Sequence, residues 1–501
     1  MAEKLVRFRE LLGEISDIDS ASSVLGWDQQ TYMPPGGAPA RGQQLATLGK
    51  LSHEMFISDE FGTALEKARG EVADLDPDSD EARLVKRIGR EFGKATKVPS
   101  EWVGEFNLVT SDAFMSWQKS RAEAAFAGFA GPLEKIVAMR KEFVEFFAPY
   151  EHVYDPLLDD FEPGMKTAQV QAVFEELRPQ QVALVRDIVE KGTPVDDSIL
   201  RQKFPEKKQL EFGLEVIKQC GYDMERGRQD KAPHPFSTSF SRDDVRITTR
   251  VTQDYLPEAL FGSIHEAGHA MYEQGVSEAF ERTPLMNGTS LGLHESQSRL
   301  WENLVGRSRA FWKAFYPKLK KTFSKQLGTV DMETFYRAIN KVEPSFIRVA
   351  ADEATYNLHI MLRFDLEIAL MQGDLAVADL PAAWNEKFEE YLGLTPPDDA
   401  MGVMQDIHWS AGLFGYFPTY ALGNLVASQL WERLLADIPD IEAQIEKAQF
   451  GELLTWLREK VHIFGGKFMP TELIKRATGS DLTPEPYLNY LRSKFGEIYS
   501  L

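Results

Sequence analysis

The stretch 263–275, SIHEAGHAMYEQG, combines residue types that can bind and use a metal ion. His265 and His269 are four residues apart, so on a helix both imidazoles face one point. Zinc accepts such nitrogen ligands, and a catalytic zinc site keeps one position open for water. Glu266 follows the first histidine directly, where its carboxylate can act as the general base toward that water. The pattern predicts a hydrolytic metal site.

Chance accounts poorly for this motif. The chain has 9 histidines in 501 residues, so a random His-Glu-x-x-His is expected in about one such chain in a hundred. Gly268 lies inside the expected helix at a cost of about 1 kcal/mol relative to alanine, which indicates the close approach of another element. Two histidines leave the metal one ligand short. Glu295, in the next expected helix (291–308), is the first candidate, and Glu302 is the alternative.

The elements that must position these residues are mostly helical. Pro257 suits a first helical turn, and Gly275 closes the motif helix. Apolar residues recur at three-to-four spacing in much of the chain, as in AGPLEKIVAMRKEFVEFF. Residues 234–251, HPFSTSFSRDDVRITTRV, alternate instead and predict a β-hairpin directly before the motif helix. This hairpin either completes a helical core or offers an edge strand to an extended peptide.

The composition, with 43% hydrophobic and 27% charged residues, is typical of a globular protein. No fixed-period repeat or long linker divides the chain, so we expect one domain over residues 1–501, with a helical part to about 230, a metal-site part to about 430 and a helical end. The net charge of −21 disfavours binding to nucleic acid and to anionic membranes. The charged N-terminus, a single cysteine and the lack of a long apolar run predict a cytoplasmic protein without membrane spans.

Six short segments resemble the carboxypeptidase Taq family, helical zinc-dependent carboxypeptidases related in fold to angiotensin-converting enzyme and neurolysin. They are HPF at 234–236, DVRIT at 244–248, HEAGH at 265–269, HESQ at 294–297, IRVAAD at 347–352 and GVMQDIHW at 402–409. The resemblance implies a large, mainly α peptidase fold. It would have two lobes around a deep substrate groove and a small β-hairpin or sheet beside the active site. It also implies a homodimer that releases C-terminal amino acids from peptides through a metal-activated water.

The resemblance assigns the metal and the base to residues of the histidine motif and of HESQ. His265, His269 and Glu295 would hold one divalent metal ion per chain, zinc or, as the alternative, cobalt. Glu266 would be the general base.

Further residues take their roles from the resemblance alone. His408 and Tyr420 would donate hydrogen bonds to the developing oxyanion, with Tyr416 as the other tyrosine of the same stretch, placed in substrate binding. Arg348 would bind the free C-terminal carboxylate of a peptide, because a guanidinium fork matches a carboxylate. A structural ion pair with Asp352 is the alternative for this arginine.

Other assignments stay open at this point. Arg246 competes with Arg348 as the carboxylate anchor, and His234 is a further candidate for substrate binding. Three aspartates are candidates to orient the metal-binding histidines: Asp244, Asp352 and Asp406. An oligoendopeptidase on the same scaffold, or a non-catalytic peptide-binding protein, are the rival functions.

Overall fold

Helices dominate the computed structural model, which describes residues 5–501. Residues 1–4, at the start of the charged N-terminal segment, lie outside the described residues. The N-terminal helices are α1 (Val6–Thr31), α2 (Ala38–Phe56), α3 (Asp59–Val72), α4 (Asp80–Ala95), α5 (Ser100–Ala122), α6 (Ala127–Glu145), α7 (Asp155–Leu158), α8 (Thr167–Lys191) and α9 (Glu206–Cys220). The mainly α fold class predicted from the sequence is confirmed.

Along the sequence, a small sheet lies between these helices and the histidine motif. Its strands are β1 (Gly227–Lys231), β2 (Ser237–Ser241) and β3 (Asp244–Thr249), in the order β1-β3-β2. β2 and β3 form the antiparallel hairpin predicted for 234–251, with Ser237 opposite Ile247 and an irregularity between Ser239 and Ser241. β1, which pairs with β3 in parallel, was not predicted, because its sequence GRQDK lacks an apolar alternation.

The remaining helices carry the motif and most of the core. They are α10 (Leu256–Gln274), α11 (Leu291–Arg299), α12 (Arg309–Thr322), α13 (Ser324–Leu327), α14 (Met332–Ile339), α15 (Tyr356–Gln372), α16 (Leu380–Leu392), α17 (Pro418–Asp437), α18 (Ile441–Ile445), α19 (Gly451–Lys460), α20 (Pro470–Thr478) and α21 (Glu485–Tyr499). Pro257 occupies the first turn of α10 and Gly275 follows its end, as predicted. Ser290 caps α11 by accepting a hydrogen bond from the backbone N–H of Leu293.

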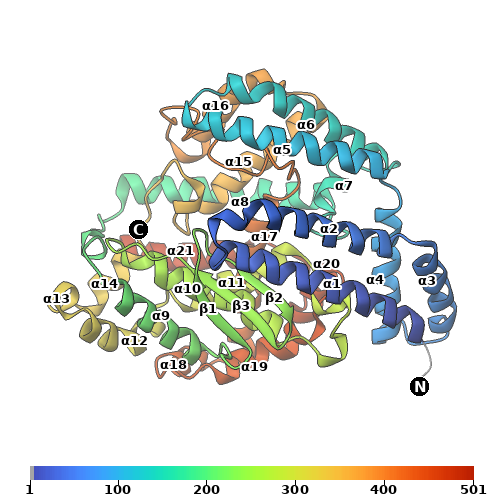
Figure 1. Cartoon of the computed structure of the whole chain (residues 1–501). Helices are drawn as coiled ribbons and strands as arrows, with labels where there is room; N and C mark the ends of the chain where they lie inside the picture. The colour runs from blue at the N-terminus through green and yellow to red at the C-terminus, as the bar shows by residue number, and fades with distance from the viewer. Residues whose placement is uncertain (1–4) are drawn as a thin grey trace.

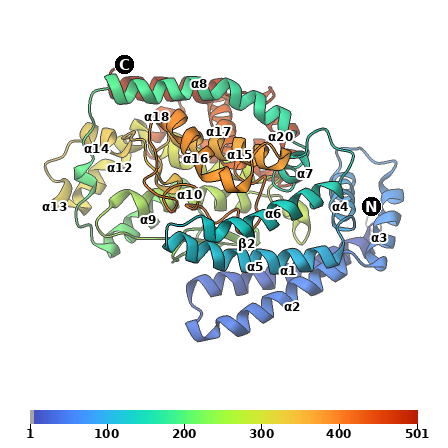
Figure 2. The same cartoon turned by 90° about the horizontal axis from the view of Figure 1, so that it is seen from above.

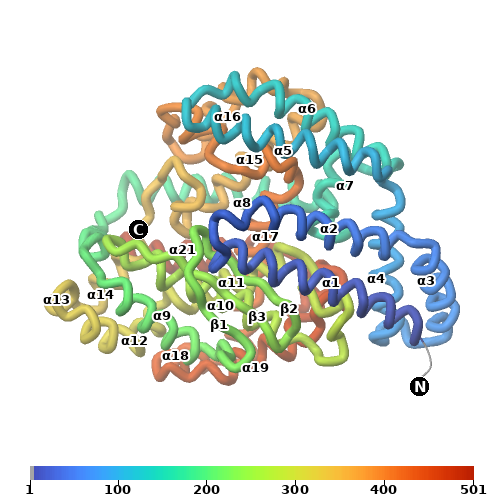
Figure 3. The backbone as a smooth tube through the Cα atoms, in the orientation of Figure 1, coloured from blue at the N-terminus to red at the C-terminus, as the bar shows by residue number. Residues whose placement is uncertain are grey.

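The elements stack around α17, whose residues are buried along most of its length. Figure 1 shows α5, α6 and α16 above, and the sheet with α9 and α10 below. α1 and α2 form a hairpin that lies on one side of the molecule, opposite α8, as the view from above shows (Figure 2). The tube in Figure 3 follows the chain from α1 to the C-terminus, which lies on the side of the molecule away from the start of α1.

Two apolar clusters support this arrangement. The larger one runs from Trp102 to Tyr499 and includes the buried face of α10. The smaller one joins α1, α3 and α4 to the segment 276–286, directly after α10. No helix of the described residues combines the length and the apolar character needed to cross a bilayer.

Candidate active site

Glu295 of α11 completes a cluster with the two histidines of α10. Its Oε2 atom lies 3.3 Å from Nε2 of His269 and 3.6 Å from Nε2 of His265. The ligand atoms of the three residues all lie within 4.8 Å of one another. Ligands bound to one tetrahedral zinc at about 2.1 Å are roughly 3.4 Å apart, so the donor set fits a single divalent cation.

Two glycines allow α11 to bring Glu295 to this point. A Cβ atom on Gly268 of α10 would lie 2.7 Å from the carbonyl oxygen of Gln297. On the other side of α11, a Cβ atom on Gly423 of α17 would lie 2.6 Å from Cγ of Glu295. Any larger residue at either position would push α11 away, which explains the glycine inside the motif helix.

Glu302 binds the opposite edge of one histidine. Its Oε2 atom lies 2.9 Å from Nδ1 of His265, and its carboxylate also contacts Arg299 at 3.3 Å and Arg307 at 3.2 Å. Burial raises its pKa, but the hydrogen bond with His265 and the charges of the arginines lower that pKa to about 2. The structure places Glu302 behind the histidine and not among the three ligand atoms. Glu302 belongs to the π-helical segment, residues 300–305, in which α11 continues.

His269 has a different neighbour on its Nδ1 edge. Its Nδ1 atom lies 2.5 Å from Nδ1 of His294, and Nε2 of His294 lies 2.6 Å from Oε1 of Glu273. Sequence reasoning missed both residues. Glu273 stands four residues after His269 on the same helix, so the i,i+4 spacing could have indicated it.

The aspartates suggested as partners of the histidines bind other groups, so that prediction is wrong. Asp244 makes a two-pronged pair with Arg246. Asp352 accepts backbone N–H groups, among them that of Glu343 at 3.0 Å. Asp406 pairs with Arg348 at 2.8 Å.

The protonation states of the ligands suit metal binding. Burial opposes the ionisation of Glu295, but Arg299, His265 and His269 hold the pKa of this carboxyl well below its usual range. Burial lowers the pKa of His269 to about 3. At neutral pH Glu295 is therefore an anion and His269 a neutral imidazole, as metal ligation requires.

Glu266 differs from Glu295 although it is equally enclosed. Glu266 is only 7% exposed. Burial raises the pKa of Glu266 to about 7; the carboxylates of Glu295 and Glu302 add to the rise, while His265 opposes it. A carboxyl group with this pKa can accept and release a proton near neutral pH.

His408 and Tyr420, predicted from the resemblance as one group, lie together. Nε2 of His408 is 3.4 Å from the Tyr420 hydroxyl, and the ring of Tyr416 is 5.2 Å from the His408 ring. Burial lowers the pKa of His408 to about 4, so this imidazole is neutral at pH 7. Burial is the main cause of the raised pKa of Tyr420, and the charge of Glu295 adds to the rise, so this tyrosine lies within electrostatic reach of the ligand cluster.

Arg348 is buried beside these aromatic residues, 4% exposed. Its Nε and Nη2 atoms donate to one oxygen of Asp406, and its Nη1 atom donates to the Tyr356 hydroxyl at 2.9 Å. The pair with Asp352 considered from sequence is not formed. The guanidinium carbon of Arg348 lies 4.9 Å from the ring centre of Tyr420. Arg348 therefore forms one group with Tyr420 and His408, the two residues predicted to stabilise the oxyanion.

The other two predicted substrate-binding residues lie outside this group. Arg246 of β3 pairs with Asp244 and stacks on Trp27 of α1, with its guanidinium carbon 4.4 Å from the ring centre. His234 is exposed in the segment between β1 and β2. The edge strand β2 is itself partly covered by α1, since the Ser20 hydroxyl donates to the carbonyl oxygen of Phe240.

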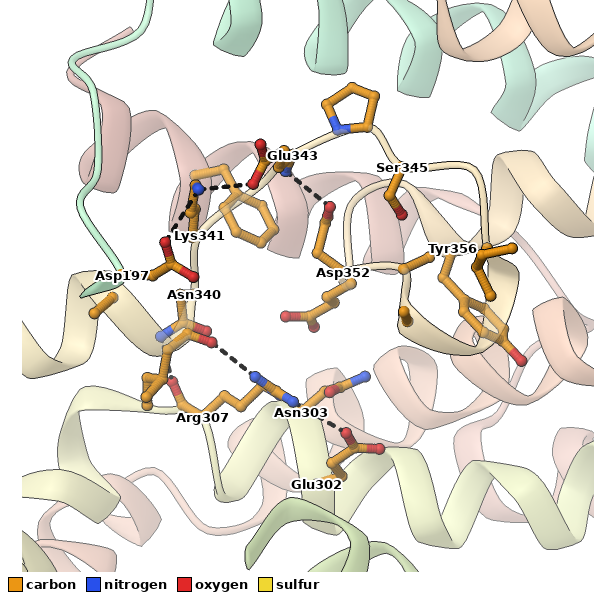
Figure 4. A pocket seen from close by; sticks show the side chains of 18 of the residues that line it. Asp197, Glu302, Asn303, Arg307, Asn340, Lys341, Glu343, Ser345, Asp352 and Tyr356 are labelled. Atoms are coloured by element: carbon orange, nitrogen blue, oxygen red, sulfur yellow. Dashed lines mark hydrogen bonds and ion pairs between the residues drawn. The ribbon is translucent and has the colours of Figure 1, made fainter. Parts of the chain in front are cut away.

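A cavity of about 520 Å³ is lined by Arg299 and Glu302, which contact Glu295 and His265, but not by the three ligand residues themselves. Glu302 and Arg307 lie on one side of it, and Glu343 and Asp352 lie on the opposite side (Figure 4). Tyr356, which contacts Arg348, also lines it. This volume is within the range of pockets for small ligands. The residues that line the cavity come from segments far apart in the sequence, between Asp197 and Phe495.

The chain is similar to known proteins along almost its whole length. A model of the carboxypeptidase Taq (M32) metallopeptidase family matches residues 7–495. Thermostable carboxypeptidase 1 of Thermus thermophilus is 41% identical over 499 residues, covering 98% of each chain. Carboxypeptidase 1 of Bacillus subtilis is 38% identical over 497 residues, covering 99% of this chain and 98% of the other. The crystal structure of an M32 carboxypeptidase from Deinococcus radiodurans superposes with a TM-score of 0.96 at 42% identity, covering 99% of each chain.

Proposed function

Because the chain belongs to the carboxypeptidase Taq (M32) family and is a metallocarboxypeptidase, we propose that it removes C-terminal amino acids from peptides with one zinc ion held by His265, His269 and Glu295. The convergence of these three ligand atoms within 4.8 Å carries the proposal. Cobalt is the alternative metal, since both accept this ligand set. The bound cation would supply a Lewis acid that polarises the scissile carbonyl and makes water more acidic.

Glu266 is the general base in this proposal. It accepts a proton from the attacking water and delivers it to the amine of the leaving amino acid. Two observations support this role: Glu266 is buried, and the charges of His265 and Glu295 act on its carboxyl group. In the metal-free protein, burial raises the pKa of Glu266 to about 7.

His408 and Tyr420 stabilise the oxygen of the scissile carbonyl as negative charge develops on it. Their contact at 3.4 Å places the Tyr420 hydroxyl and Nε2 of His408 in one region. The charge of Glu295 also acts on Tyr420 there. One such donor contributes about 2.7–4 kcal/mol, or roughly 10²–10³ in rate.

Arg348 binds the C-terminal carboxylate of the peptide. Tyr416, whose ring packs against His408, contributes to substrate binding beside it. The hydrogen bonds with Asp406 and Tyr356 fix the guanidinium and leave part of its fork of N–H donors for a ligand. Arg246 is a weaker candidate for this role, because Asp244 already occupies its fork.

The test compares one peptide with a free and with an amidated C-terminus, and mass spectrometry follows the products. A carboxypeptidase yields a ladder of C-terminal truncations from the free peptide and little from the amide. An oligoendopeptidase cuts both peptides internally and equally. Glu266→Gln is expected to retain the metal and lose nearly all turnover; full activity of this variant would exclude Glu266 as the base.

Homodimeric assembly and a cytoplasmic location stay predictions from the sequence. Light scattering during size-exclusion chromatography measures the first of these. A homodimer gives twice the mass of one chain.

A further inference from the structure

The Nδ1 edge of His269 begins a chain of side chains that leads away from the ligand cluster. His294 lies 2.5 Å from this edge, and Glu273 lies 2.6 Å from the far nitrogen of His294. The second oxygen of Glu273 accepts the hydroxyl of Ser239 on β2 at 3.4 Å. The chain therefore connects α11, α10 and the sheet to one of the two histidines.

Metal ligation by His269 determines the direction of every hydrogen bond in this chain. Nε2 of His269 faces Glu295 and needs its lone pair for the cation, so the proton of the neutral ring is on Nδ1. That N–H donates to Nδ1 of His294, whose own proton is then on Nε2 and is donated to Glu273. Each donor thus meets one acceptor, and the charge at the end of the chain is a carboxylate.

Packing keeps the His294 ring in this orientation. Its centroid lies 5.1 Å from the Tyr272 ring and 4.6 Å from the His269 ring. A Cβ atom on Gly288 would lie 2.9 Å from Cδ2 of His294, so the backbone at Gly288 also approaches the ring closely. The ring cannot turn away from His269 without displacing these neighbours.

We propose that His294 and Glu273 are positioning residues for the metal ligand His269, doing through an interposed imidazole what Glu302 does directly for His265. The inference rests on the proposed metal site. A hydrogen-bond acceptor at Nδ1 fixes the ring of a metal-binding histidine and increases its basicity, and loss of such a partner typically lowers metal affinity 10- to 100-fold.

The experiment titrates metal-free protein with zinc in competition with a chromophoric chelator. His294→Leu removes the acceptor but fills the space, and its zinc dissociation constant is expected to rise roughly 10- to 100-fold. His294→Asn offers an oxygen near the position of the lost Nδ1 atom and is expected to recover most of that affinity. A role of His294 in packing alone predicts the opposite order, with leucine tolerated better than asparagine.

Glu273→Met provides a second variant in case His294→Leu folds poorly, which thermal unfolding of the metal-free proteins would reveal. It removes the carboxylate from His294 and is expected to weaken zinc binding roughly tenfold. His53→Leu makes the matched replacement at an exposed histidine of α2 and is expected to bind zinc like the wild type. Wild-type affinity in both His294→Leu and Glu273→Met, or equal losses in His294→Leu and His294→Asn, would overturn the proposal.

The same titration separates this inference from the proposed function. His265→Ala is expected to abolish tight zinc binding. If it binds zinc like the wild type, the metal site itself is wrong and the positioning role falls with it. If His265→Ala loses zinc while both positioning variants keep it, only the role of His294 and Glu273 is wrong.

Discussion

Glu302 and Glu295 bind opposite edges of the same imidazole. Oε2 of Glu302 lies 2.9 Å from Nδ1 of His265, whereas Oε2 of Glu295 lies 3.6 Å from its Nε2 atom. Arg299 contacts both carboxylates, at 2.7 Å for Glu295 and 3.3 Å for Glu302. Arg299 therefore links Glu295, a proposed metal ligand, to Glu302, the hydrogen-bond partner of the proposed ligand His265.

Glu302→Gln tests whether the contact between Glu302 and His265 supports metal binding. The amide keeps an oxygen near His265 but loses the charge that increases the basicity of the imidazole, so zinc affinity is expected to fall roughly tenfold. Glu343→Gln is the matched control, because Glu343 lines the same cavity but pairs with Lys341 at the surface. Chelator competition measures both variants; equal affinities would show that Glu302 does not act through His265.

Gly423→Ala tests the close contact between α17 and α11. The new methyl would lie within 2.6 Å of Glu295, so we expect a loss of stability of about 1–3 kcal/mol and weaker metal binding. Gly496→Ala in α21 meets no atom within 4 Å and should be neutral, or stabilising by up to about 1 kcal/mol. Thermal unfolding and zinc titration check both effects, and Gly423→Ala behaving like Gly496→Ala would refute the argument.

Arg348→Ala tests the carboxylate anchor. A hydrogen bond between charged groups contributes about 1.5–3 kcal/mol, so kcat/KM for a free peptide should fall roughly 10- to 100-fold. An amidated peptide lacks the charge and should be affected much less. Steady-state kinetics on the two peptides give the ratio of the losses. An equal loss on both would mean that Arg348 has a structural role only, as the partner of Asp406 and Tyr356.

Glu162 provides a pH-dependent test of the fold around α11. It is buried, its carboxylate accepts the backbone N–H of Gly292, and burial raises its pKa from 4.5 to about 7. A raised folded-state pKa stabilises the fold below pH 4.5, and this contribution is lost as the pH rises through about 7.

Glu162→Gln should remove that loss. The metal-free variant is expected to be more stable than the wild type at pH 8, by at most about 3 kcal/mol, with a smaller difference at pH 5. Denaturant unfolding at the two pH values measures this, and Glu190→Gln at the surface is the control. A variant that is less stable than the wild type at pH 8 would show that the carboxyl group is ionised without penalty.

The sequence was sufficient for the parts of the site that depend on one helix or on adjacent segments. Spacing alone put His265 and His269 on one face, and Gly268 indicated the close approach that α11 makes. The hairpin of β2 and β3 followed from alternation. These features are local, so propensity and periodicity determine them.

Contacts between distant segments could not be predicted. Glu302 lies in the π-helical turn after α11 and contacts the far edge of His265, and no residue pattern predicted this turn. The pair of Arg348 with Asp406 joins segments 58 residues apart, so the nearer Asp352 was the wrong partner to consider. β1 was missed for a related reason, because a short polar strand is defined by its neighbour and not by its own sequence.

The metal content of the purified chain tests the central claim most directly. We predict one zinc or cobalt ion per wild-type chain by elemental mass spectrometry, and a nearly metal-free Glu295→Gln variant that still folds. A wild-type chain without stoichiometric metal, or a Glu295→Gln variant with its full complement, would contradict the claim that His265, His269 and Glu295 form the metal site.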